Sequence, residues 1–168
     1  MEKVISSEGT PMRGESTPIS RIIEAPRKEV YQAFVDPQAV ATWFAPNTMQ
    51  AHVHAFDPSQ GGQFRTSLVY QNPEDSQRGK TTGDTDTYHG RFVELVPYER
   101  IVEAIEFESQ DPEFAGEMRM TVMLADVDDG TEVSLLYEDV PTGIRPEDNE
   151  AGARQSLRKL AAFVEQSR

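Results

Sequence analysis

The sequence has 168 residues, no cysteine and a formal net charge of −13, from 16 Lys and Arg against 29 Asp and Glu. Such a charge repels phosphate backbones and anionic lipid surfaces, so nucleic-acid and membrane partners are disfavoured. The lack of cysteine excludes disulfides, a thiol nucleophile and thiolate metal ligands. No apolar run reaches the roughly 18–20 residues of a membrane span, and the N-terminus lacks the apolar core of a signal peptide. We therefore expect a cytoplasmic protein.

The first 17 residues differ in composition from the rest of the chain. They are polar and contain the breakers Gly9, Pro11 and Gly14. We expect a flexible or short-strand lead-in over residues 1–17, and a single domain with its own hydrophobic core over residues 18–168.

Two short helices are predicted after a first strand at residues 19–25. Pro26 suits the first turn of a helix, because the amide hydrogen that proline lacks has no partner there. The Asp36-Pro37 pair ends that helix, because the residue before a proline avoids the helical conformation. The predicted helices span residues 27–35 and 37–43.

Alternating apolar and polar residues then predict six strands. Short turns join most of them, such as Asp128-Asp129-Gly130, so consecutive strands should pair antiparallel. The strands are expected at residues 49–56, 63–71, 87–96, 100–108, 116–127 and 131–138.

One connection is much longer than a hairpin needs. Residues 72–86 contain no large aliphatic or aromatic side chain, which indicates a flexible flap or a functional loop. Gly79-Lys80-Thr81 lies within it, but Glu74 stands where a phosphate-binding loop has its first glycine. We reject nucleotide binding there.

A long amphipathic helix is predicted over residues 147–168, with Asn149 or Asp148 as its N-cap. Its apolar face comprises Ala153, Leu157, Leu160, Ala161 and Val164. Since most of the preceding chain is predicted as strand, this one helix must cover most of a sheet. The fold class is therefore α+β.

Five segments, in order, resemble a known family: IIEAPRKEVYQAFVDPQAVATWFAP, DPSQGG, HGRFVELVPYERIV, DGTEVSL and DNEAGARQSLRKLAAFVE. The chain resembles the START-like (SRPBCC) superfamily, specifically bacterial single-domain members of the type named after the activator of the heat-shock protein 90 ATPase. This resemblance implies a helix-grip fold, like that of the birch-pollen allergen. In that fold a curved antiparallel sheet of six to seven strands wraps a long C-terminal helix, and two short helices follow the first strand.

The chain departs from the family pattern at one position. A Trp commonly follows the glycine where this sequence has Gly152-Ala153. The smaller side chain predicts additional free volume beneath the helix, unless another side chain fills it.

The resemblance also implies a small-molecule site between the sheet and the C-terminal helix. We expect a hydrophobic or aromatic ligand there and no cofactor; the alternative is a closed, fully packed core. The predicted cavity residues are Trp43, Phe44, His54, Phe56, Phe64, Leu68, Tyr70, Phe92, Ile105, Phe107, Met120, Leu124, Ala153 and Leu157.

Other side chains leave further functions open. His52 and His54 share one face of a strand, but a metal site needs a third ligand that the sequence does not place, so none is predicted. A His acting as acid or base would make the chain an enzyme, although a binding protein is the preferred interpretation. A chaperone-activating role is a third, less favoured alternative. The expected assembly is a monomer or weak homodimer.

Charged residues within the predicted strands are expected to face solvent. We predict that the arginines pair with neighbouring carboxylates and that the glutamates are solvated. These residues are Arg65, Arg91, Arg119, Glu94, Glu103 and Glu106.

Overall fold

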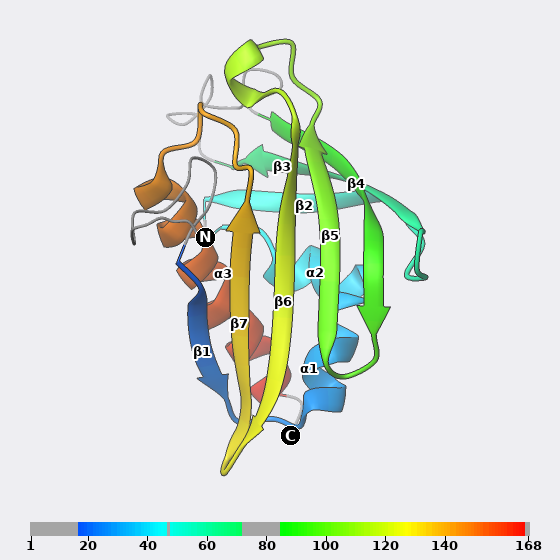
Figure 1. Cartoon of the computed structure of the whole chain (residues 1–168), viewed down its shortest axis with the longest axis vertical. Helices are drawn as coiled ribbons and strands as arrows, with labels where there is room; N and C mark the ends of the chain where they lie inside the picture. The colour runs from blue at the N-terminus through cyan, green and yellow to red at the C-terminus, as the bar shows by residue number, and fades with distance from the viewer. Residues whose placement is uncertain (1–16, 47, 72–84, 167–168) are drawn as a thin grey trace, which may run out of the picture.

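The computed structural model describes residues 17–46, 48–71 and 85–166 of the chain. Seven antiparallel strands form one sheet in the order β1-β7-β6-β5-β4-β3-β2 (Figure 1). The predicted α+β fold and antiparallel helix-grip topology are therefore confirmed. The strands are β1 (Ile19–Ile23), β2 (Met49–Phe56), β3 (Gln63–Tyr70), β4 (Thr85–Val96), β5 (Arg100–Phe107), β6 (Glu117–Val127) and β7 (Gly130–Glu138).

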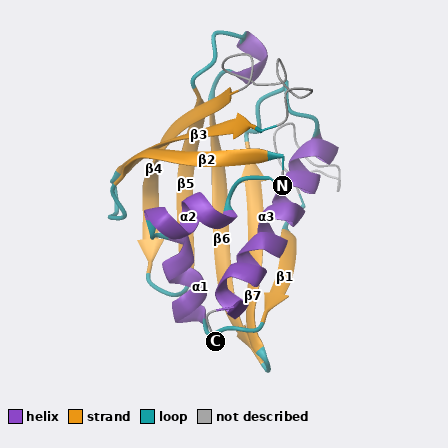
Figure 2. Cartoon of the chain, turned by 180° about the vertical axis from the view of Figure 1, so that it is seen from behind, coloured by secondary structure: helices purple, strands orange, loops and turns teal. Residues whose placement is uncertain are grey.

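Three α-helices lie on one face of this sheet (Figure 2). They are α1 (Arg27–Phe34), α2 (Pro37–Trp43) and α3 (Pro146–Gln166), and a short 3₁₀ helix η2 (Pro112–Phe114) joins β5 to β6. The long helix α3 packs against β1, α1 and α2. None of the helices in the described part of the chain has both the length and the apolar composition that a bilayer span requires.

The sheet is strongly curved, since β2 and β3 run nearly across the direction of β5, β6 and β7 (Figures 1 and 2). Two irregularities in strand register accompany the bend. One lies in β2 between Val53 and Ala55, and the other lies in β4 between Phe92 and Glu94. An extra residue in one strand increases the local twist and bends it.

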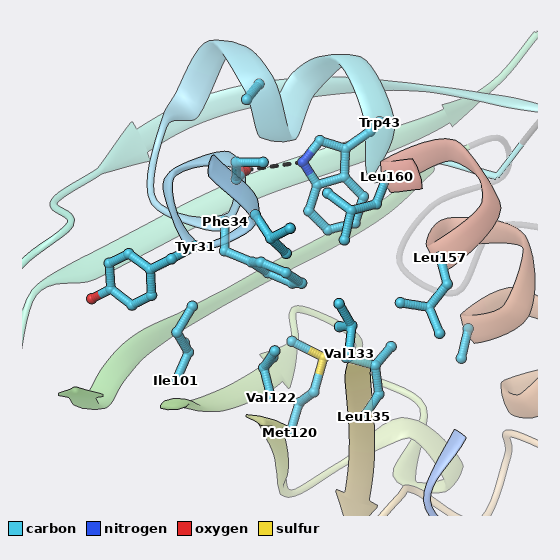
Figure 3. Close-up of a cluster of buried hydrophobic side chains, with 14 of the residues drawn as sticks. Tyr31, Phe34, Trp43, Ile101, Met120, Val122, Val133, Leu135, Leu157 and Leu160 are labelled. Carbon is cyan, nitrogen blue, oxygen red and sulfur yellow. Dashed lines mark hydrogen bonds between the residues drawn. The ribbon is translucent and has the colours of Figure 1, made fainter. Parts of the chain in front are cut away.

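The core fills the space between α3 and the inner face of the sheet (Figure 3). Leu160 is fully buried and Leu157 is 2% exposed. Trp43 ends α2, and its indole Nε1 donates a hydrogen bond to the Ala33 carbonyl oxygen at 2.9 Å. This bond fixes the two short helices to each other, so together they close one end of the sheet.

Most elements begin or end one or two residues from their predicted bounds; β1, for example, ends at Ile23 rather than at residue 25. The helix α3 begins at Pro146, and the amides of Asp148 and Asn149 donate to the Arg145 carbonyl oxygen. Neither residue is therefore the N-cap, because a proline, with its fixed φ, favours the first helical position. Strand β4 begins at Thr85, two residues inside the predicted loop.

Two predicted features lie outside the described residues. These are the lead-in, apart from Thr17, and the proposed flap over residues 72–84, which contains Gly79-Lys80-Thr81.

Candidate ligand-binding groove

A groove of about 610 Å³ lies between the first half of α3 and one end of the sheet. Polar side chains from β4, β7 and α3, including Asp86, Tyr137 and Gln155, interrupt its largely apolar walls. Small-molecule sites have this composition and occupy roughly 300–1,000 Å³. The apolar lining includes Phe44, Met49, Leu68, Ile105, Phe107, Phe114, Met118 and Met120.

The groove is hollow because α3 presents small side chains above it. Gly152 and Ala153 both line the groove, and a Cβ placed on Gly152 would meet no atom within 4 Å. Ala153 is only 4% exposed, so its methyl group points inward. One helical turn further on, Leu157 fills the corresponding space. The free volume predicted at Gly152-Ala153 is present.

Two polar contacts hold α3 over the groove. Ser156 Oγ donates to the Phe44 carbonyl oxygen at 3.1 Å, and Lys159 Nζ donates to the Ala45 carbonyl oxygen. Partial burial lowers the pKa of Lys159. Both contacts join α3 to the chain that follows α2, so they set the width of the groove.

An ion pair lies at the rim. Arg145 Nε and Nη2 donate to the two carboxylate oxygens of Asp148 at 2.9 and 3.0 Å. This hydrogen-bonded carboxylate raises the pKa of Arg145. Both side chains line the groove and are well exposed, so the pair contributes little to stability but neutralises the charge at the entrance.

A second, much smaller cavity lies deeper, under α1 and α2. This inner chamber holds about 20 Å³, which is room for one water molecule. Phe44 and Met120 line both the chamber and the groove, so their side chains form the wall between the two. The remaining lining comprises Phe34, Val40, Trp43, Phe56, Phe64, Thr66, Tyr88, Phe92 and Glu103.

Glu103 is an acidic side chain in the lining of the inner chamber. It lies in β5 opposite Phe92 of β4 and Met120 of β6, and Met120 in turn lies opposite Tyr137 of β7. The residue is 9% exposed, and burial raises the pKa of its carboxyl group to about 8. At neutral pH the carboxyl is therefore protonated and can donate a hydrogen bond.

This position corrects the sequence interpretation, which placed Glu103 in solvent. On β5, Glu103 lies two residues from Ile101 and two from Ile105, so it shares their face of the strand, and both isoleucines face the core. The period of two along a strand fixes its side chain inward despite its charge. That alternation was the signal in the sequence that could have found it.

Two tyrosines accompany the glutamate. Burial raises the pKa of Tyr88 and of Tyr137, and the nearby Glu103 carboxyl raises both further. Tyr88 is also hydrogen-bonded to Thr66. The interior thus contains a small group of polar side chains, Thr66, Tyr88, Glu103 and Tyr137, within an aromatic surround.

Comparison with known proteins identifies the family. A sequence profile described as Activator of Hsp90 ATPase homolog 1-like protein matches residues 24–165, which is most of the chain. The chain belongs to this family. Among curated proteins, none matches it.

Solved structures agree with the family assignment. The crystal structure of protein CV1439 from Chromobacterium violaceum is 33% identical, with a TM-score of 0.80, over 92% of this chain and 99% of that one. An AHSA1-like protein from Aeromonas hydrophila is 20% identical, with a TM-score of 0.66, over 90% and 92% of the two chains. Protein Ms6760 from Mycobacterium smegmatis is 15% identical, with a TM-score of 0.69, over 87% and 88%. The last two support the fold alone.

In this family member, the predicted cavity residues divide between the two cavities. Trp43, Phe56, Phe64 and Phe92 line the inner chamber, whereas Leu68, Tyr70, Ile105, Phe107 and Ala153 line the groove. Phe44 and Met120 line both. Leu124 and Leu157 are buried core residues that line neither.

The prediction for His54 is wrong. The register shift between Val53 and Ala55 breaks the alternation of β2, so His54 does not share the inward face of Phe56. Its side chain is exposed, and Nε2 lies 2.8 Å from Ser67 Oγ. An imidazole there cannot reach a molecule in the groove.

The outer face of the sheet carries paired charges, as predicted for two of the arginines. Arg65 Nε donates to Glu108 at 2.8 Å and Arg91 Nη1 donates to Glu117 at 2.6 Å. His89 lies 3.1 Å from the same Glu108 carboxylate. Within the described ranges, no group of three or more His, Asp or Glu side chains is arranged to hold a metal ion.

Proposed function

We propose that this protein binds a small, predominantly apolar or aromatic molecule in the groove between α3 and the sheet. The groove of about 610 Å³ carries the proposal, because its volume and its largely apolar wall suit such a ligand. The small side chains at Gly152 and Ala153 support it, since they leave open the space beneath the helix. Aromatic rings such as Phe44 and Phe107 offer contact surface for an aromatic ligand.

Fluorescence titration with the uncharged dye N-phenyl-1-naphthylamine tests this proposal. The dye fluoresces on entering an apolar site, so the wild-type chain should show a saturable signal. Ala153→Trp places an indole inside the groove and should weaken dye binding about tenfold or more. Ala162→Trp is the matched control, because Ala162 lies on the exposed side of the same helix and its substitution leaves the groove unchanged.

Equal dye affinity in both variants, or no saturable binding by the wild type, would refute the proposal. A thermal melt of each variant shows whether it is folded. If Ala153→Trp does not fold, Ala153→Leu provides the same test with a smaller side chain.

The two alternatives considered from the sequence gain no support from this site. Acid–base catalysis by His52 or His54 required one of them to face the groove, but both are exposed and neither belongs to its described lining. The family name points to activation of a chaperone ATPase, but no feature of the groove favours that role. An ATPase assay with a purified chaperone, over a series of concentrations of this protein, measures it directly.

A further inference from the structure

The carboxyl group of Glu103 is unusual in its surroundings. Apart from Thr66 and Tyr88, every described residue that lines the inner chamber with it is apolar. Burying a carboxyl in such a place opposes folding unless a partner compensates for the lost hydration. A threonine or tyrosine would supply a hydrogen-bond donor at lower cost. A carboxyl adds the capacity to become a negative charge, which a cation in contact with it would stabilise.

The charges around Glu103 favour a cation supplied by a ligand. Tyr88 from β4 and Tyr137 from β7 are its titratable neighbours, and the α1 and α2 side chains that line the chamber are all apolar. Among the described residues of the groove wall, Arg145 alone carries a positive charge, and it lies at the rim, paired with Asp148. No protein cation in the described lining is therefore placed to neutralise Glu103.

The groove wall itself also suits a positive charge. The groove lining contains the acid Asp86, whose side chain is buried at 2% exposure. Phe44, Phe107 and Tyr137 present aromatic rings to the same space. The faces of aromatic rings attract cations and repel anions, so a positively charged group is favoured and a carboxylate is disfavoured.

The groove and Glu103 are separated by side chains rather than by backbone. Met120 lies directly opposite Glu103 in the sheet and lines both cavities, as does Phe44. A methionine side chain has three rotatable bonds and adapts its shape readily. A change of its rotamer would bring the end of a ligand in the groove into contact with the Glu103 carboxyl.

We propose that the ligand is a small aromatic or apolar amine, whose ammonium group enters between Met120 and Phe44 and forms an ion pair with Glu103. This inference rests on the proposed function, since it requires the groove to bind a small molecule. On binding at neutral pH, the Glu103 O–H bond breaks, its proton passes to the buffer, and the resulting carboxylate pairs with the ammonium group. No oxidant, reductant or other reactant is required.

Two isosteric probes separate the charge from the shape of the ligand. These are 1-naphthylmethylamine, which is a cation at neutral pH, and 1-naphthalenemethanol, which is neutral. Isothermal titration calorimetry in phosphate and in Tris at pH 7 measures the protons released, because the two buffers differ in ionisation enthalpy. We expect release of about one proton for each amine bound and none for the alcohol. Amine affinity should also rise about tenfold from pH 6 to pH 7, because ionising Glu103 becomes easier, whereas alcohol affinity should stay constant.

Glu103→Gln removes the ionisable group and keeps the shape. It should weaken amine binding about 10–100-fold, as expected for loss of a charged hydrogen bond, and leave alcohol binding within about threefold. Glu106→Gln is the control, since Glu106 lies on the same strand but faces His89 on the outer side of the sheet. It should change neither affinity.

The outcomes distinguish this inference from the proposed function. Binding of both probes without proton release, or with equal affinity in the Glu103→Gln variant, would overturn the amine assignment while leaving the groove a binding site. Failure of both probes and of N-phenyl-1-naphthylamine would overturn both proposals. The proton-release measurement uses the wild-type chain, so it stands even if the variant does not fold.

Discussion

The two ends of the interface between α3 and the sheet are packed very differently. Under the second half of α3, Leu157, Leu160 and Val164 are buried in the core. The inner chamber of about 20 Å³ beside α1 and α2 is lined by no described residue of α3. Under the first half, Gly152 and Ala153 leave a groove of about 610 Å³. The same helix and the same strands therefore form a closed core at one end and an open site at the other.

This difference shows that side-chain size along one helix sets the free volume. A Leu side chain inserted into an interior makes many dispersion contacts, whereas an Ala makes few. The backbone of α3 is continuous across both ends, and Ser156 and Lys159 hold it at the boundary between them. A site can thus be opened in this fold without moving the backbone.

The largest effect should come from the buried acid at the closed end. A raised carboxyl pKa means that the folded state holds its proton more tightly than the unfolded state, so stability falls as pH rises from the ordinary value of 4.5 to about 8. Glu103→Gln removes this dependence. The free energy of unfolding of the variant, relative to that of the wild type, should therefore rise by about 3–5 kcal/mol from pH 5 to pH 9. Urea unfolding at both pH values measures it. Parallel pH profiles would show that Glu103 does not titrate in this range.

Truncation at the closed end should cost somewhat less. Leu160 is fully buried between α3 and the sheet, so Leu160→Ala should destabilise the fold by about 2–5 kcal/mol through lost contacts and a new cavity. Leu136→Ala, at a half-buried site on β7, is the control and should cost clearly less. If denaturant unfolding shows that the two variants lose the same free energy of unfolding, the closed end is not tightly packed.

The smallest effect is expected at the open end. A Cβ at Gly152 meets nothing, so Gly152→Ala should stabilise α3 by about 0.5–1 kcal/mol through its higher helix propensity. At Gly90, by contrast, a Cβ would overlap the Ala104 carbonyl oxygen and approach the Phe64 ring. Gly90→Ala should therefore destabilise the protein. A loss of stability at Gly152 would indicate that the groove is narrower than described.

The sequence predicted the fold well because hydrophobic periodicity and turn residues specify the elements locally. The apolar face of α3 was predicted residue by residue, and Ala153, Leu157, Leu160, Ala161 and Val164 are its buried residues. The small residue at Ala153 also pointed to the groove. Such features depend on nearest neighbours along the chain, so they can be read from the sequence.

The errors arose where tertiary structure overrides local pattern. The extra residue in β2 brings Phe56 to the inner face, while His54 stays on the exposed face with Gln50 and His52, and nothing in a regular alternation signals a bulge. Glu103 was assigned to solvent because charged residues are rarely buried, although its parity on β5 placed it inward. The division of the interior into two cavities was also missed, since it depends on how Phe44 and Met120 meet across the fold.

The pairing of β1 with β7 has a consequence for how the chain folds. Every other pair of neighbouring strands in the described sheet is consecutive in sequence, but Ser20 and Ser134 meet across 114 residues. Closing so long a loop costs chain entropy before any stabilising contact between the two strands can form. The five consecutive pairs from β2 to β7 can therefore form first, each from neighbouring sequence. We therefore expect the N-terminal strand to dock onto β7 as a late step of folding.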